Sequence, residues 1–113
     1  MHELAITQSM LDLVLRQAEE AGAGKVGKIS LVIGEMTGVV ARSVQFYFDF
    51  LSRDTPAEGA VLNFKVMPTT ARCRDCCKEF ELGEFDWTCP HCQGNNIDIT
   101  GGKELYVESI EVD

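Results

Sequence analysis

The sequence predicts an α+β fold in which two helices pack on a three-stranded sheet and a cysteine-rich module is inserted into the chain. Three observations predict it. Two segments repeat apolar residues with the period of a helix, and three others alternate them with the period of a strand. Residues 72–100 carry all five cysteines and little apolar pattern, so that segment needs a crosslink to fold.

The first helix is predicted over residues 5–21 and is followed by a strand over residues 28–34. Apolar residues recur along the helix at spacings of three and four, which gathers them on one face, and they alternate along the strand. Gly22 follows the helical pattern and is expected to end it. The residues expected to face the core are Leu11, Val14, Leu15, Ala18, Ile29, Leu31 and Ile33.

A second helix is predicted over residues 41–52 and a second strand over residues 61–67, with a loop over residues 54–59 between them. The helix carries an apolar stripe that Phe46 and Phe50 widen, and we expect the whole aromatic group to lie in the core. The other residues of the stripe and of the strand's inner side are Val44, Tyr47, Phe48, Leu51, Leu62, Phe64 and Val66.

The last predicted strand covers residues 103–112. Its first two apolar residues share one phase, and its last two have the opposite phase. A β-bulge near Glu108 and Ser109 adds one residue to the strand and would bring both pairs to the same face. The four residues concerned are Leu105, Val107, Ile110 and Val112.

Composition limits the classes of function. The chain has 113 residues, 45% of them apolar and 25% charged, as in an ordinary globular protein. Its net charge of -8 disfavours nucleic-acid partners, because phosphate backbones repel it. No apolar run is long enough to cross a membrane, and the first residues lack the basic region of a signal peptide, so we expect a cytoplasmic protein. No phosphate loop, HExxH motif or nucleophile–base pattern indicates an enzyme.

Four cysteines form two CxxC pairs, Cys73 with Cys76 and Cys89 with Cys92. Each pair can turn two sulfurs toward one ion, and the two pairs together give the tetrahedral sulfur set that zinc or iron prefers. The spacing therefore predicts a zinc-ribbon-like module with a structural zinc. A disulfide or dithiol pair is the weaker alternative in a cytoplasmic chain, and a rubredoxin-like iron site is the other.

Two more residues of the module carry metal-binding side chains. Cys77 is the odd cysteine: it either replaces Cys76 by a shift of one residue or stands beside the site without binding. His91 lies between two of the predicted ligands and is expected to be an exposed loop residue. An auxiliary ligand is the less favoured role for it.

The first three residues, Met1, His2 and Glu3, form a second candidate metal site. A free α-amine, a deprotonated amide nitrogen and the His2 imidazole can chelate one ion in fused rings. This planar, nitrogen-rich set suits Ni(II) or Cu(II), and the Glu3 amide or carboxylate could complete it. The helical pattern starts almost at once, which indicates that the terminus is held against the protein body.

The chain resembles the HypA family of nickel-insertion accessory proteins of [NiFe]-hydrogenase maturation. The likeness lies in the opening Met-His-Glu-Leu, the Ile-Gly-Glu at residues 33–35, the double CxxC and the closing Glu-Ser-Ile-Glu-Val at residues 108–112. These motifs occur in the family's order and cover the whole length. Some members have a nickel-linked aspartate near position 40, but Val40 stands here, so no role is carried over.

The resemblance implies two metals and two domains. It implies transported Ni(II) at His2, with help from Met1 and Glu3, in a discontinuous nickel-binding domain of residues 1–69 and 102–113. It implies zinc on the four CxxC cysteines in a domain of residues 70–101. It also implies two partners, a HypB-like GTPase and the hydrogenase large subunit, and it leaves a homodimer open.

Two rival functions remain at the level of sequence. A zinc-ribbon module that binds nucleic acid or transcription proteins accounts for the cysteines, although the acidic charge disfavours the nucleic-acid version. A rubredoxin-like electron carrier accounts for the same cysteines with iron. Neither explains the histidine at position 2.

Overall fold

The structure is a computed structural model and describes residues 3–82 and 87–113. The order of its elements is the predicted one, with boundaries that differ by one or two residues. The helices are α1 (Glu3–Glu20) and α2 (Ala41–Leu51), and a 3-10 turn, η1 (Glu35–Thr37), lies between them. The strands are β1 (Val26–Gly34), β2 (Val61–Met67), β3 (Thr70–Cys73), β4 (Glu79–Glu81), β5 (Ile97–Gly101) and β6 (Leu105–Val112).

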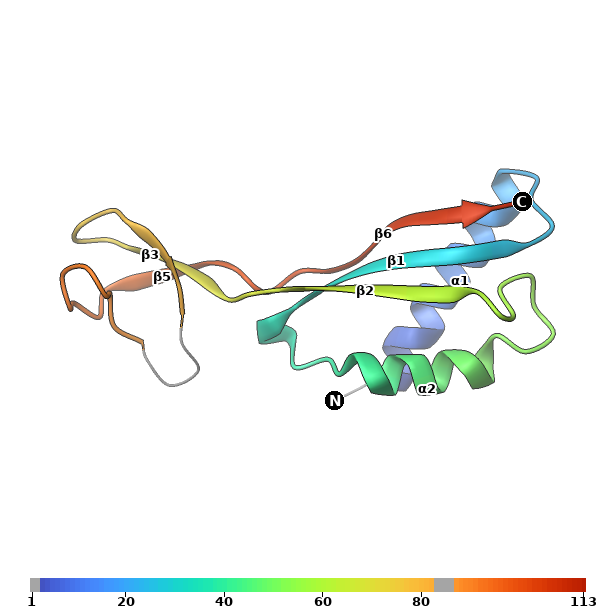
Figure 1. Cartoon of the computed structure of the whole chain (residues 1–113), viewed down its shortest axis with the longest axis horizontal. Helices are drawn as coiled ribbons and strands as arrows, with labels where there is room; N and C mark the ends of the chain where they lie inside the picture. The colour runs from blue at the N-terminus through green and yellow to red at the C-terminus, as the bar shows by residue number, and fades with distance from the viewer. Residues whose placement is uncertain (1–2, 83–86) are drawn as a thin grey trace.

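The first sheet has the strand order β2-β1-β6, and both helices cover the same face of it (Figure 1). The central strand β1 is parallel to β2 and antiparallel to β6. A parallel pair needs a crossover connection, which α2 provides between β1 and β2. This arrangement confirms the predicted fold of two helices on a three-stranded sheet.

The bulge predicted in the last strand is present. Ser30 pairs with Ser109 while the next residue, Leu31, pairs with Val107, so Glu108 is the extra residue of β6. The bulge brings the apolar residues on its two sides to the same face of β6, because Val107 and Ile110 both pack against the buried core cluster.

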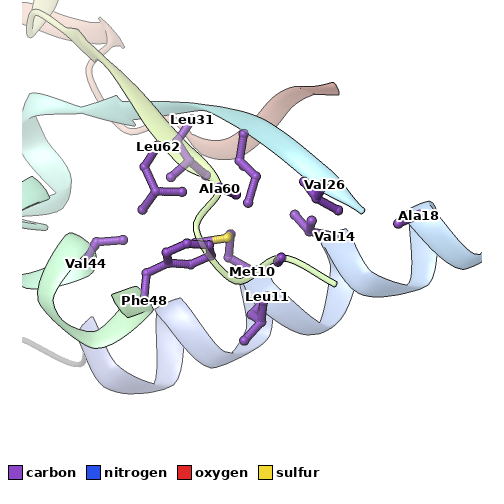
Figure 2. Packing of buried hydrophobic residues seen from close by; sticks show 12 residues of the cluster. Met10, Leu11, Val14, Ala18, Val26, Leu31, Val44, Phe48, Ala60 and Leu62 are labelled. Atoms are coloured by element: carbon purple, nitrogen blue, oxygen red, sulfur yellow. The ribbon is translucent and has the colours of Figure 1, made fainter. Parts of the chain in front are cut away.

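The hydrophobic core lies between the first sheet and the two helices (Figure 2). Phe48 is its largest fully buried side chain, with Leu11 and Val14 from α1 and Ile29 from β1 around it. The predicted apolar faces of α1 and β1 are therefore largely confirmed. Helical spacing brings these residues together because positions three and four apart share a face.

Two aromatic residues that were expected in the core are outside it. Phe46 is 69% exposed and Phe50 is 61% exposed, so this prediction was wrong. Val44 and Phe48 occupy the buried side of α2, and residues two positions away project from the opposite side of a helix. The Phe46 ring packs edge-on against Tyr47 with centroids 5.4 Å apart.

The cysteine module forms a second sheet with the strand order β4-β3-β5, in which both pairings are antiparallel. The two sheets lie at opposite ends of an elongated molecule that measures 54 × 25 × 17 Å (Figure 1). The module is inserted between β2 and β6, as predicted. The assignment of residues 70–101 to a separate domain stays a prediction.

The two sheets meet at a tight backbone junction. The Met36 amide donates to the Gly102 carbonyl at 2.7 Å, and the Thr69 amide donates to the Glu35 carboxylate at 3.4 Å. Gly34 packs directly on Gly102, so a methyl group at position 34 would overlap that backbone. Gly102 itself has φ of 104°, which glycine adopts without strain.

Within residues 3–82 and 87–113, no helix is long and apolar enough to cross a membrane.

Candidate metal centre

The four cysteines of the CxxC pairs converge at one point of the second sheet. Their sulfur atoms all lie within 4.8 Å of one another, with 3.5 Å between Cys73 and Cys92 and 3.6 Å between Cys76 and Cys89. A zinc ion bound tetrahedrally at about 2.3 Å from each sulfur would set the sulfurs about 3.8 Å apart. The donor set therefore fits a tetrahedral sulfur-bound ion, and metal binding itself stays a prediction.

The two CxxC turns repeat one backbone geometry. In each turn the amide of the fifth residue donates to the carbonyl of the first cysteine at 2.8 Å, from Cys77 to Cys73 and from Gln93 to Cys89. The first cysteine's amide donates to the carbonyl of the sixth residue, at 3.0 Å and 2.8 Å respectively. The fifth residue has φ of 62° in both turns. The repeated turn directs both cysteines of each pair to the same side.

Cys77 stands at the left-handed position of its turn, where the other turn has Gln93. It is exposed and outside the cluster, whereas Cys76 is inside it. Of the two readings that the sequence left open, the structure supports a Cys77 that stands beside the site. His91 is also exposed, and its backbone amide donates to the Cys89 sulfur at 3.4 Å.

Thiol ionisation differs strongly within the cluster. For Cys92, the Gly94 amide works to lower the pKa, but the Cys73 thiol and burial outweigh it and raise the pKa to about 12. For Cys89, burial works to raise the pKa, but the amides of Cys92 and His91 outweigh it and lower the pKa to about 7. Four thiols this close do not ionise alike on their own, and a bound cation would favour the thiolate form of all of them.

An ion pair that the sequence did not predict braces the module. Both guanidinium contacts from Arg74 to the Asp98 carboxylate are 2.7 Å long, and the Arg74 amide donates to the Asn96 carbonyl at 2.9 Å. The hydrogen bond from Arg74 lowers the pKa of Asp98. Both side chains are at least half exposed, so the pair fixes geometry more than it adds stability.

The structure describes only part of the N-terminal candidate site. Met1 and His2 are outside the described residues, but Glu3 is 9% exposed and begins α1. Its carboxylate accepts the Val40 amide at 3.3 Å, and its carbonyl accepts the Thr7 hydroxyl at 2.6 Å. The start of α1 is therefore held against the segment before α2, at the end of the first sheet's helical layer and apart from the cysteine cluster (Figure 1).

Comparisons with known proteins agree along the whole chain. A family profile described as "HypA: Hydrogenase/urease nickel incorporation, metallochaperone, hypA" matches residues 1–112. A hydrogenase maturation factor HypA of Dehalococcoides mccartyi is 50% identical, with 100% of this chain and 95% of the relative covered. That of Caldanaerobacter subterraneus subsp. tengcongensis is 46% identical, with 100% of both chains covered.

Solved structures show the same fold. The solution structure of the Ni metallochaperone HypA from Helicobacter pylori matches with a TM-score of 0.68 and 24% identity, covering 99% of this chain and 97% of that one. A second solution structure of a HypA protein matches with a TM-score of 0.74 at 24% identity, covering 99% and 96%. At this level of identity the likeness shows the fold alone.

Proposed function

Because the chain belongs to the HypA family, the metallochaperones of hydrogenase nickel incorporation, we propose that it binds Ni(II) at its N-terminus and passes it to the large subunit of [NiFe]-hydrogenase. Proteins of this family carry metal and are not enzymes. The observation that carries the proposal is the match of the whole chain, from the first residue to the last strand, to this family.

The proposed nickel ligands are the Met1 amine, the His2 amide nitrogen and the His2 imidazole, with Glu3 beside them. Nitrogen ligands in a plane suit Ni(II). The structure supports this place in one respect: α1 begins at Glu3. The first amides of a helix have no carbonyl acceptor within the helix, so an amide there can lose its proton and bind Ni(II) without breaking a helical hydrogen bond.

Glu3 has a structural task that limits its part in the site. Its carboxylate already accepts the Val40 amide at 3.3 Å, so one oxygen is partly engaged. We assign Glu3 mainly to positioning: it fixes the base of the N-terminus against the segment before α2. An ion held at residues 1 and 2 would then sit on a fixed support and not at the end of a loose tail.

The cysteine cluster is proposed to hold a structural zinc in a zinc-binding domain of residues 70–101. Four protein sulfurs would complete the coordination of the ion, and a site without an open position stabilises structure. Two of the four sulfurs belong to fully buried residues, Cys73 and Cys89. The transported Ni(II) would instead be bound by the nickel-binding domain of residues 1–69 and 102–113. Its ligands there would be few and exchangeable, so a receiving site could displace these ligands and take up the ion.

We further propose a HypB-like GTPase as partner and the cytoplasm as the compartment. Nickel delivery to an enzyme that is being assembled needs direct contact with that enzyme or with a second delivery protein. The net charge of -8 favours metal cations and proteins over nucleic acids as partners.

The test is a calorimetric titration of Ni(II) into the zinc-loaded chain and its His2→Ala variant. We expect at least about a hundredfold weaker nickel binding in the variant, because the imidazole closes one of two chelate rings. His91→Ala is the matched control, since His91 is the other histidine of the chain and is exposed. An N-terminal extension should also weaken binding. Equal nickel affinity of wild type and His2→Ala would refute the site.

A further inference from the structure

Residues 34–40, here called the β1–α2 connection, lead from the end of β1 through η1 to the start of α2 (Figure 1). The connection ends at Val40, whose side chain is 51% exposed and whose backbone makes two contacts. The Val40 amide donates to the Glu3 carboxylate at 3.3 Å, and the Val40 carbonyl accepts the Val44 amide at 3.2 Å. The backbone of this one residue therefore joins the starts of both helices.

One hydroxyl group fixes the shape of the β1–α2 connection. Thr37 donates its hydroxyl to the Gly34 carbonyl at 2.8 Å, and the same oxygen accepts the Val39 amide at 3.2 Å. Gly38, which lies between them, has φ of 70°, a left-handed conformation that glycine adopts without strain. A threonine bonded to the backbone on both of its sides holds that stretch in one conformation. Thr37 therefore sets the direction in which the chain arrives at Val40.

The β1–α2 connection is also attached to the rest of the protein on either side of Thr37. Before it, the Met36 amide donates to the Gly102 carbonyl at 2.7 Å. After it, the Val39 side chain packs against the core cluster. With both neighbours fixed, the Thr37 hydroxyl determines the path between them.

We propose that Thr37 is a positioning residue for nickel binding. Its hydroxyl would hold the Val40 amide where that amide fixes Glu3, and Glu3 would in turn support the ligands at residues 1 and 2. This inference rests on the proposed function, because it concerns the same N-terminal site. Ligands that are ordered beforehand bind more strongly, since less conformational entropy is lost when the ion arrives. Removal of the hydroxyl should therefore weaken nickel binding without removing a ligand.

The chain contains a matched threonine away from this site. Thr55 makes the same two bonds: it donates to the Ser52 carbonyl at 2.6 Å and accepts the Ala57 amide at 3.2 Å. It lies in the loop after α2, at the opposite end of that helix from Val40. Substitution of either threonine by valine keeps a branched side chain and removes both hydrogen bonds, so Thr55→Val is the control for a general loss of stability.

Calorimetric titration of Ni(II) into the full, zinc-loaded chain tests the proposal. We expect Thr37→Val to bind nickel about fivefold to tenfold more weakly than wild type, because its N-terminus is less ordered beforehand. Thr37→Ser keeps the hydroxyl and should stay within about twofold of wild type, as should Thr55→Val. Urea unfolding verifies that all three variants are folded and compares the stability that the two valine variants lose.

Two further measurements separate positioning from general stability. The first is amide hydrogen exchange of the nickel-free chain, in which the Val40 amide should exchange faster in Thr37→Val than in wild type or Thr55→Val. The second repeats the titration in a Glu3→Ala background. There Thr37→Val should weaken nickel binding little further, because the two residues act through one contact.

The outcomes distinguish this inference from the proposed function. If Thr37→Val binds nickel as tightly as wild type while His2→Ala does not, the inference is wrong and the N-terminal site stands. If His2→Ala binds as tightly as wild type, both are wrong. Equal weakening by Thr37→Val and Thr55→Val, an unchanged exchange rate of the Val40 amide, or a full further loss in the Glu3→Ala background would each contradict a positioning role for Thr37.

Discussion

Glu3 shows how one carboxylate joins two segments that are far apart in the sequence. It begins α1, is nearly buried, and accepts the Val40 amide. A buried carboxylate without a partner would be costly, so this contact permits the burial. The contact draws the segment before α2 to the base of the proposed nickel site, and it makes residue 40 a neighbour of the N-terminus.

The sequence could not predict that contact. Nothing in the pattern around Glu3 or Val40 indicates a partner, because the contact depends on how α1 and α2 pack. The ligand spacing, in contrast, predicted which cysteines converge, because a CxxC turn is local. The spacing left open whether Cys76 or Cys77 faces the cluster, and that depended on the left-handed backbone at Cys77.

Cys76→Ser and Cys77→Ser should separate the two neighbouring thiols. We expect Cys76→Ser to lose zinc or bind it far more weakly, because it removes one of four sulfurs, and structural zinc contributes on the order of 10 kcal/mol to folding. Cys77→Ser should keep one zinc per chain. Elemental analysis after dialysis measures this, and zinc retention by Cys76→Ser with loss by Cys77→Ser would show that Cys77 is the ligand.

At the scale of elements, periodicity predicted the order of helices and strands and even the bulge at Glu108. The change of phase within one strand was a sufficient signal, because residues on the wrong face would leave the core open. Periodicity wrongly predicted that Phe46 and Phe50 are buried. A stripe of aromatic residues indicates burial only if something covers that side of the helix, and Phe46 and Phe50 project from the side of α2 opposite to the buried Val44 and Phe48.

The junction between the sheets depends on Gly34, where a side chain has no room. We expect Gly34→Ala to destabilise the protein by about 1–3 kcal/mol, because its methyl group would overlap the Gly102 backbone. Gly24→Ala is the matched control, since a methyl group there meets open space and should change stability by no more than about 0.5 kcal/mol. Urea unfolding measures both. Equal stabilities of the two variants would show that the junction adjusts freely.

At the scale of the whole molecule, the two ends are stabilised by different means. Among residues 3–82 and 87–113, the buried core cluster comes from α1, α2, the first sheet and the loop before β2, whereas the buried residues of the module include two of the clustered cysteines, Cys73 and Cys89. One end is thus held by apolar burial, and the other by a crosslink that we assign to zinc.

Removal of zinc by a chelator should therefore affect the two ends unequally. We expect the helical circular dichroism signal to persist, because both helices pack on the first sheet and not on the cysteine module. The fluorescence of Trp87 should change. Trp87 is the chain's single tryptophan and lies two residues before Cys89. If the helical signal and the fluorescence are lost together, the two parts fold as one cooperative unit.

The insertion of the module between β2 and β6 also has a consequence for how the chain reaches its native state. β6 must find β1 across a connection of residues 68–104, and closing a long flexible loop costs entropy that grows with its length. A module that has already folded around a bound ion would bring the two ends of that connection together at Thr70 and Gly101, which are paired neighbours. Docking of the last strand would then require only a short search. Metal uptake at one end of the molecule would thus determine how fast β6 docks on β1 and completes the sheet at the other end.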